Sequence, residues 1–380
     1  MKHTFIESDV ELEKKCRELM QEKIVGVDLE ADAMHSFHEK ICLIQLVTQH
    51  QAYLIDPFKI ENMSALKALL AAKDVIKVFH GSDFDIRSLD RDYGARVNNL
   101  SDTEIACRFL GIRERGPAAL LKQYFNIHLD KKYQKEDWSK RPLDPEMVAY
   151  SVMDVAFLVS LHHTIHEQLA QKKRLEWARE EYERQAGVTY ENNHTAPLFR
   201  RFKGAGKLDK RTLAVLENLL QLRLSLARTK DKPLFKIFSN KSIMTMATQK
   251  PETLEQIQKF KMLSKRQADM YGNECVESIV AALKMPHNEL PGYPGTRRPG
   301  KDETVQARIR QLKKMRGKLS RTHAIEAGFL LNNAVITAIA LENPSVIDNL
   351  KQIDMMRKWQ VQAIGNDIIK HLNYIRSERH

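Results

Sequence analysis

Two carboxylates separated by one residue, Asp28 and Glu30, are the first feature of this sequence that could do chemistry. They follow the apolar, β-branched run 24–27, which predicts a buried strand. Because residues two apart on a strand share one face, the two side chains would lie together. Burying two like charges together is costly unless a cation lies between them. The pair therefore predicts half of a metal site, although two solvated acids at a strand end are the simpler alternative.

A further acidic segment follows the apolar run 75–79, where a strand gives way to a helix and where Asp83 and Asp85 occur. Ser82 and Asp85 match the Ser-x-x-Asp capping box, which completes a helix N-terminus and needs no metal. Residue types alone favour this capping role over catalysis. They also leave open which of the two aspartates would act in a catalytic site.

Tyr150 and Asp154 are spaced i, i+4 on an expected helix, so their side chains share one helix face. Asp154 lies within the apolar run 152–157, where a carboxylate needs a partner or a raised pKa. A Lys or Arg is the simpler partner, but none stands three or four residues away. A metal ion is therefore the more attractive partner for Asp154.

Four acids from a strand, a helix start and a later helix, with one Tyr, match the needs of two-metal phosphodiester cleavage. Two divalent cations about 4 Å apart share a bridging carboxylate and take further oxygen ligands. One ion lowers the pKa of the attacking water and the other stabilises the leaving oxygen. The Tyr hydroxyl can orient that water.

The elements that must position these residues predict a mixed α/β domain. Strands are expected at 24–27, 41–47, 52–55, 75–79 and near 98–102, giving a five-stranded sheet. The short gaps between the first three favour antiparallel neighbours, whereas strands and helices then alternate. A long helix is expected to begin at Asp144-Pro145-Glu146 and to continue towards Leu169.

The rest of the sequence predicts two small all-helical domains C-terminal to the α/β domain. Polar or Pro- and Gly-rich linkers fall at 187–210 and 285–300, which gives domains at 1–190, 207–285 and 303–378. The two helical segments place their leucines and basic residues in the same order, so we interpret them as a tandem repeat. Two unrelated helical units are the alternative.

The net charge of +12 is divided unequally along the chain. Residues 191–380 carry 34 Lys and Arg against 18 Asp and Glu, and the front half is slightly acidic. This division predicts that the N-terminal half does the chemistry and that the C-terminal half binds a polyanion. No apolar run has the length of a membrane span, and four scattered cysteines exclude a cysteine-based zinc site. A cytoplasmic protein without a membrane partner is expected.

Taken in order, the acidic motifs resemble the DEDD superfamily of 3′–5′ exonucleases, in its Tyr-bearing branch, and most closely the ribonuclease D family. The matching segments are Asp28-Leu29-Glu30, 42–46, 78–85 with Asp85 on the catalytic position, 137–143, and Tyr150-x-x-x-Asp154. The helical segments resemble helicase-and-RNase-D C-terminal (HRDC) domains, the first clearly at 232–240 and the second weakly. The resemblance covers nearly the whole chain.

The resemblance implies a role for each matching residue. Asp28, Glu30 and Asp154 would hold the metal that activates the nucleophile, and Asp28 would bridge to a second ion. Asp85 would bind that second ion through water, and Tyr150 would position the attacking water. The ions would be Mg²⁺ or Mn²⁺.

The resemblance also implies residues that contact the substrate. Lys131 and Gln134 fall where related enzymes touch the terminal nucleotide, and Leu89 falls where an apolar side chain packs on its base. One departure is Ser88, which stands where some relatives have an aromatic residue that stacks on a base. Stacking contributes about 1–3 kcal/mol per base, so this departure bears on affinity and not on the chemistry.

The fold implied is a ribonuclease-H-like exonuclease domain followed by two HRDC-like domains. The implied activity is metal-dependent 3′–5′ hydrolysis of RNA with a single-stranded 3′ end, releasing nucleoside 5′-monophosphates without an organic cofactor. Precursor tRNA is the substrate that the resemblance suggests. The alternatives are a 3′–5′ DNA exonuclease and a catalytically inactive nucleic-acid-binding scaffold, and the presence of all four acids and the Tyr argues against the scaffold.

Overall fold

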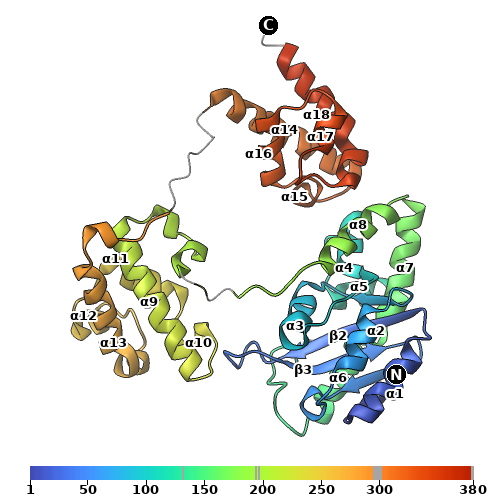
Figure 1. Cartoon of the computed structure of the whole chain (residues 1–380), viewed down its shortest axis with the longest axis horizontal. Coiled ribbons are helices and arrows are strands. Elements are labelled where there is room, and N and C mark those ends of the chain that lie inside the picture. Colours follow the sequence, from blue (N-terminus) through green and yellow to red (C-terminus); the bar gives the residue numbers. More distant parts are fainter. Residues whose placement is uncertain (131, 193–194, 196, 294–301, 378–380) are drawn as a thin grey trace. The chain divides into compact units, whose positions relative to one another are not determined.

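The computed structural model describes residues 1–130, 132–192, 195, 197–293 and 302–377, which form two compact units (Figure 1). The first unit contains Met1–Glu30, Ile41–Tyr190 and Arg298–His380. The second contains Ala31–Lys40 and Glu191–Arg297.

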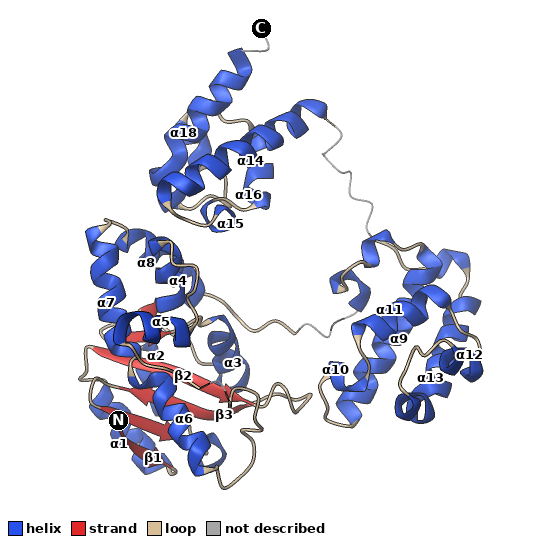
Figure 2. Cartoon of the chain, turned by 180° about the vertical axis from the view of Figure 1, so that it is seen from behind, coloured by secondary structure: helices blue, strands red, loops and turns tan. Residues whose placement is uncertain are grey.

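The first unit is built on a mixed sheet, whose strands are red in Figure 2. The sheet has six strands in the order β1-β4-β3-β2-β5-β6. The β1–β4, β2–β5 and β5–β6 pairs are parallel, and β3 and β4 are antiparallel. This arrangement confirms the mixed sheet. The strands are β1 (Lys2–Ile6), β2 (Ile24–Ala31), β3 (Ile41–Val47), β4 (Gln51–Ile55), β5 (Ile76–Phe79) and β6 (Leu100–Asp102).

The predicted count of five strands is wrong, because the sequence analysis missed β1. This strand lies at the edge of the sheet and pairs only with β4. Ile6 is its one buried residue, and its first three residues are exposed. An edge strand with so little burial has no alternating apolar pattern to reveal it.

Helices cover both faces of this sheet. On one face Val25, Val27 and Leu29 of β2 pack in a core with α1, α2 and α3. The opposite face packs against α6 and α7, and the side chains of Asp28 and Glu30 lie on that face by strand alternation. The helices of this part are α1 (Asp9–Leu19), α2 (Ser64–Ala71), α3 (Asp83–Tyr93), α4 (Thr103–Leu110), α5 (Pro117–Phe125), α6 (Pro145–Ala156), α7 (Leu158–Gln171) and α8 (Leu175–Ala186), with a short 3₁₀ helix η1 (Pro57–Lys59).

The helix predicted at Asp144 begins as expected, because the Asp144 side chain accepts a hydrogen bond from the Glu146 N–H at 2.8 Å. It does not run unbroken to Leu169. Phe157 leaves the helical conformation (φ −111°, ψ 4°), and its ring stacks on Phe125 of α5 at 5.8 Å between centroids. The predicted long helix is therefore two helices, α6 and α7.

The α6–α7 run, Pro145–Gln171, is long and apolar enough to cross a membrane by length and composition. However, 56% of its most apolar stretch is buried inside the protein. Its apolar character therefore has a direct explanation in the core on the α6 face of the sheet.

The two helical segments repeat one arrangement at an offset of 93 residues. Arg223 donates to the Phe238 carbonyl at 3.1 Å, and Arg316 donates to the Leu331 carbonyl at 2.9 Å. The first repeat has α9 (Lys210–Thr229), α10 (Leu234–Ile237), α11 (Asn240–Gln249), α12 (Leu254–Lys259) and α13 (Lys265–Lys284). The second repeat has α14 (Glu303–His323), α15 (Ala327–Leu330), α16 (Asn333–Glu342), α17 (Ile347–Lys351) and α18 (Lys358–Ser377). Three further 3₁₀ helices are η2 (Leu198–Arg201), η3 (Ala205–Lys207) and η4 (His287–Glu289).

The second repeat shares a hydrophobic core with α4, α7 and α8 of the α/β domain. Phe109 of α4 contacts Phe329 and Trp359 edge to face, with centroid distances of 5.0 Å in both cases. Such aromatic pairs stabilise a contact beyond the area that they bury. The second repeat is therefore an integral part of the first unit.

Gly26 of β2 lies close to Val47 of β3 and Leu158 of α7, and it supplies a test of this packing. A Cβ at this position would lie 2.5 Å from Val47 Cγ1 and 3.2 Å from Leu158 Cδ2. Gly26→Ala is expected to destabilise the first unit by about 1–3 kcal/mol through overpacking. Thermal unfolding measures the effect.

Gly317→Ala in α14 is the matched control, because nothing lies within 4 Å of its added Cβ. It is expected to stabilise the protein by up to about 1 kcal/mol through higher helix propensity. Equal melting temperatures for the two variants would contradict the close approach of β2 and α7.

Candidate active site

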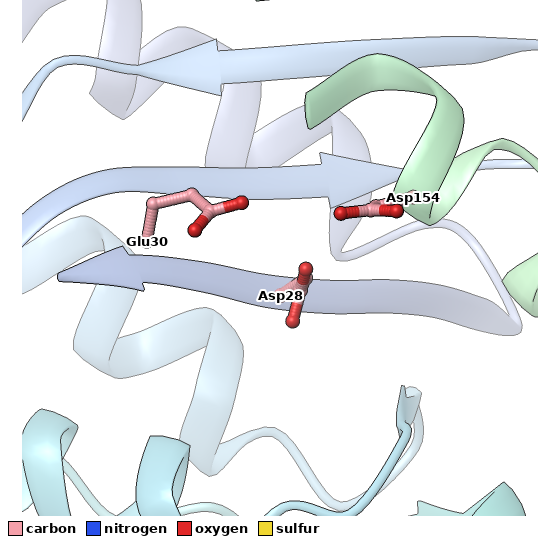
Figure 3. Close-up of side chains that lie close together, drawn as sticks. All are labelled: Asp28, Glu30 and Asp154. Carbon is pink, nitrogen blue, oxygen red and sulfur yellow. The ribbon is translucent and has the colours of Figure 1, made fainter. Parts of the chain in front are cut away.

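Asp28, Glu30 and Asp154 form a compact carboxylate cluster, with one oxygen from each lying within 4.8 Å of the others (Figure 3). Asp28 and Glu30 come from β2, and Asp154 comes from α6. The structure therefore brings together three acids that the sequence analysis placed in one site. We call these three residues the acidic cluster.

Within the part of the chain that the structure describes, the interactions that shift the pKa values of the acidic cluster include no positively charged group. Burial, followed by the nearby Asp154 charge, raises the pKa of Asp28 to about 7. Burial raises the pKa of Asp154 to about 6, and a hydrogen bond from the Tyr150 hydroxyl opposes that rise. The pKa of Glu30 is also raised, by burial and then by the neighbouring carboxylates. A cation bound between these carboxylates would reduce their electrostatic repulsion, so the cluster is a candidate metal site.

Asp85, in the first turn of α3, lies near Asp28 but outside the group of three. It is only 7% exposed, and burial followed by the charge of Asp28 raises its pKa. This placement suits a carboxylate that reaches an ion through water, the role expected of it from the sequence.

The capping box that competed with this role is not formed. Ser82 makes no side-chain cap to α3, and its hydroxyl donates instead to Asp102 at 2.7 Å. Asp83 is 60% exposed and pairs with Arg87 at 3.1 Å, one turn along the helix. Of the two aspartates that the sequence left open, Asp85 is therefore the one that faces the acidic cluster.

Asp102, which the sequence analysis did not identify, organises the turn that carries Asp85. Its buried carboxylate accepts hydrogen bonds from the N–H groups of Gly81 at 3.0 Å and Ser82 at 2.8 Å. It also caps α4 by accepting from the Glu104 and Ile105 N–H groups. The only signal in the sequence was an Asp before a helix, which predicts the cap but not the bonds to a distant turn.

Tyr150 lies against two aromatic rings from the loop before α6. Its ring centroid is 6.3 Å from that of Trp138 and 5.9 Å from that of Tyr133. Arg141 anchors this loop to the sheet, because its guanidinium donates to the Asp56 carboxylate at 2.6 Å and to the Cys42 carbonyl at 2.7 Å. The anchored loop thereby supports the ring of Tyr150.

A cavity of about 250 Å³ opens over the acidic cluster. Gln134 lines it, as does His80 from the matched segment 78–85, whose pKa is lowered by burial and to which the sequence assigned no role. Leu89 and Ser88 are buried in the domain, so the structure gives no support to a contact between Leu89 and a base. Lys131 lies outside the described residues.

The sequence matches known protein families and individual relatives. A family model described as 3′–5′ exonuclease matches residues 3–170, and an HRDC domain model matches residues 212–279 and 305–372. Ribonuclease D of Sphingobium indicum is 26% identical over 97% of this chain and 94% of its own length. The exosome complex exonuclease RRP6 of Saccharomyces cerevisiae is 34% identical over 52% of this chain, which spans only 26% of that longer relative.

The fold itself is that of a solved relative. The structure of Escherichia coli RNase D, described as an exoribonuclease involved in structured RNA processing, covers 98% of this chain with a TM-score of 0.72. The match extends over 99% of that protein at 23% sequence identity, so it speaks for the fold. The α/β domain and both helical repeats are therefore the parts of one shared architecture.

The raised pKa values predict how the metal-free protein responds to pH. Because the acids hold protons more tightly when folded, the folded state binds more protons than the unfolded chain between about pH 4 and 7. The stability of the metal-free protein should therefore fall as the pH rises through this range. Asp28→Asn should raise the stability at pH 8 by about 2 kcal/mol, or about 4–8 °C in melting temperature, and by much less at pH 5.

Thermal unfolding with EDTA, Mg²⁺ or Mn²⁺ measures this effect. Either metal should stabilise the wild-type protein and have little effect on Asp28→Asn, because binding to the native state alone is stabilising. Asp83→Asn removes an exposed acid nearby and should keep the full response to metal. A destabilised Asp28→Asn variant that still responds to metal would contradict the repulsive cluster.

Proposed function

We propose that this chain, which belongs to the ribonuclease D family of 3′–5′ exoribonucleases, removes nucleoside 5′-monophosphates from single-stranded RNA 3′ ends with two divalent metal ions. The observation that carries the proposal is the acidic cluster of Asp28, Glu30 and Asp154 beneath an open cavity, with Asp85 beside it. Hydrolysis of a phosphodiester needs cations where negative charge develops, and this cluster has the oxygen donors to hold them.

The side chains of the acidic cluster carry the donor atoms that hard divalent cations prefer. The donor set consists of carboxylate oxygens, which Mg²⁺ and Mn²⁺ prefer, and contains no cysteine or histidine among its three members. Asp28, Glu30 and Asp154 would hold one ion, and Asp28 and Asp85 would hold the other. Such ions supply an activated water and neutralise the charge of the leaving oxygen.

The protein's own groups would orient the reactants. The Tyr150 hydroxyl donates to Asp154, and burial raises its pKa, so it stays protonated at neutral pH and can hold a water molecule by a hydrogen bond. Gln134 at the cavity wall would contact the terminal nucleotide. Lys131 stays a prediction for the same role.

Beyond the active site, we assign the exonuclease domain to 1–190 and the HRDC-like domains to 207–285 and 303–378. The excess of Lys and Arg in residues 191–380 supports RNA binding by this part of the chain, with an affinity that depends strongly on salt. Precursor tRNA remains our proposed substrate, and the cytoplasm our proposed compartment.

Substitution of the site residues tests the proposed roles. Asp154→Asn is expected to lower kcat by at least about 10³-fold, because it removes a charged metal ligand. Tyr150→Phe should lower kcat by about 10²-fold while metal binding survives, since every charged ligand stays and only the hydrogen bonds of the hydroxyl to the water and to Asp154 are lost. Steady-state cleavage of a short single-stranded RNA measures both. Asp83→Asn, as the control, should keep normal turnover, and full activity of Asp154→Asn would refute the assignment.

The direction and substrate of cleavage are tested on matched RNA and DNA oligonucleotides labelled at the 5′ end or the 3′ end. A 5′ label should give a ladder that shortens one nucleotide at a time, and a 3′ label should appear at once as a mononucleotide. EDTA should abolish both patterns. Faster digestion of DNA than of RNA would favour a DNA exonuclease, and binding without any cleavage would favour the inactive scaffold.

A further inference from the structure

The segment between α4 and α5, residues 111–116, leads to the wall of the active-site cavity. We call these residues the connecting segment. It is followed directly by Pro117 and Ala118, the first residues of α5, and both line the cavity over the acidic cluster. The position of this part of the wall therefore depends on the contacts that hold the connecting segment.

Arg115 ties the connecting segment to two acids from different parts of the chain. Its guanidinium donates to Glu104 in the first turn of α4, and it donates to both oxygens of Glu326 in the second repeat, at 2.8 Å and 3.4 Å. The side chains of Arg115 and Glu104 are each 18% exposed, whereas that of Glu326 is 46% exposed. A guanidinium that meets a carboxylate through two nitrogens is fixed in direction as well as in distance.

Glu104 connects this ion network to the turn that carries Asp85. Burial disfavours the ionised form of Glu104, but hydrogen bonds from Arg108 and Arg115 outweigh burial and lower its pKa. The Glu104 N–H donates to Asp102 at 2.8 Å, and Asp102 also closes the turn before α3. The network that holds Arg115 is therefore continuous with the turn before Asp85.

The second repeat also contacts the start of the connecting segment through its backbone. A Cβ added at Gly111 would lie 2.3 Å from the Ala324 carbonyl oxygen, and the φ of Gly111 is +81°, so only glycine fits there. Arg174 donates to the carbonyl of His323 at 2.8 Å and also to that of Phe109. The C-terminal end of α14 is therefore bound against the C-terminal end of α4, immediately before the connecting segment.

The backbone of Arg115 lies beside His80, which lines the same cavity as the start of α5. Burial lowers the pKa of His80, and the charges of Asp102 and Glu104 together with a hydrogen bond to the Arg115 backbone oppose that change. The His80 ring is also held at Nδ1, which lies 2.8 Å from the hydroxyl oxygen of Thr103. His80 and the start of α5 are thus two parts of the cavity wall that adjoin Arg115.

We propose that Arg115 is a positioning residue that, held by Glu326 of the second repeat, sets the wall of the cavity in which the terminal nucleotide binds. The second repeat thereby controls the affinity of the site for the 3′-terminal nucleotide, although none of the described residues lining the cavity belongs to that repeat. The metal ligands are left in place, so affinity depends on this contact and turnover does not. The inference rests on the proposed function for the identity of the substrate.

The test is Glu326→Gln in the full chain, because Glu326 is exposed and the variant keeps every group that lines the cavity. KM for a four-nucleotide oligoadenylate should rise about three- to tenfold, the range expected for coupling within one salt-bridge network, and kcat should change less than about twofold. The inhibition constant of AMP, the expected product, should rise by the same factor. Glu342→Gln, which removes another exposed acid of the second repeat, should leave all three constants unchanged.

Substitutions of Arg115 separate positioning from stability. Arg115→Gln loses both carboxylate contacts and should raise KM further, and Arg115→Lys should recover part of the loss because it keeps the charge without the two-nitrogen contact. Adding Glu326→Gln to Arg115→Gln should have no further effect, since the contact is already absent. Additive losses would overturn the proposal, and so would a lowered melting temperature of Glu326→Gln with a normal KM.

Amide hydrogen exchange supplies a measurement that does not need activity. In Glu326→Gln, peptides from residues 111–121 should exchange faster than in the wild type, whereas peptides from β2 and α6 should exchange at the wild-type rate. Unchanged exchange at 111–121 would refute the coupling to the second repeat. If the wild-type chain released no nucleotides at all, the proposed function would fail, and the exchange rates would still decide whether the second repeat holds the connecting segment.

Discussion

Mutual repulsion among the carboxylates of the active site is the interaction on which the rest of the structure depends. Asp28, Glu30 and Asp154 keep oxygens within 4.8 Å of one another, and burial makes each charge harder to hold. No local sequence preference would keep them together, so the surrounding packing must do so. That packing comes from the two cores on the faces of the sheet, where Gly26 lets α7 approach β2. A metal ion would turn this repulsion into attraction.

Two polar side chains, Asp102 and Arg141, connect these cores to the residues around the acidic cluster. Asp102 closes the turn before α3 and so sets the position of Asp85. Arg141 ties the loop before α6 to Asp56 and so supports the aromatic side of Tyr150. Both anchors are buried or half-buried and hydrogen-bonded several times, which makes each of them rigid. The site is therefore held in part by groups that lie outside the acidic cluster.

The two helical repeats keep one backbone arrangement but present different side chains at equivalent positions. The internal bonds made by Arg223 and Arg316 are the same, so the backbone arrangement is retained. Equivalent positions carry different residues, with Phe329 and Trp359 in the second repeat where the first has Lys236 and Arg266. An apolar face must be covered to be stable, whereas a basic face is stable in water and attracts polyanions.

The sequence by itself predicted the candidate residues for the chemistry, because the order and local spacing of Asp28, Glu30, Asp85, Tyr150 and Asp154 are properties of the chain. It also determined the mixed sheet and the tandem repeat, whose apolar periodicity is local. Only the tertiary structure decided what depends on distant contacts. It shows Asp85 buried near Asp28 and Asp83 exposed, and it shows that Ser82 bonds to Asp102, twenty residues away, and not to its own helix. It likewise revealed the edge strand and the burial of Leu89, because neither leaves a local pattern in the sequence.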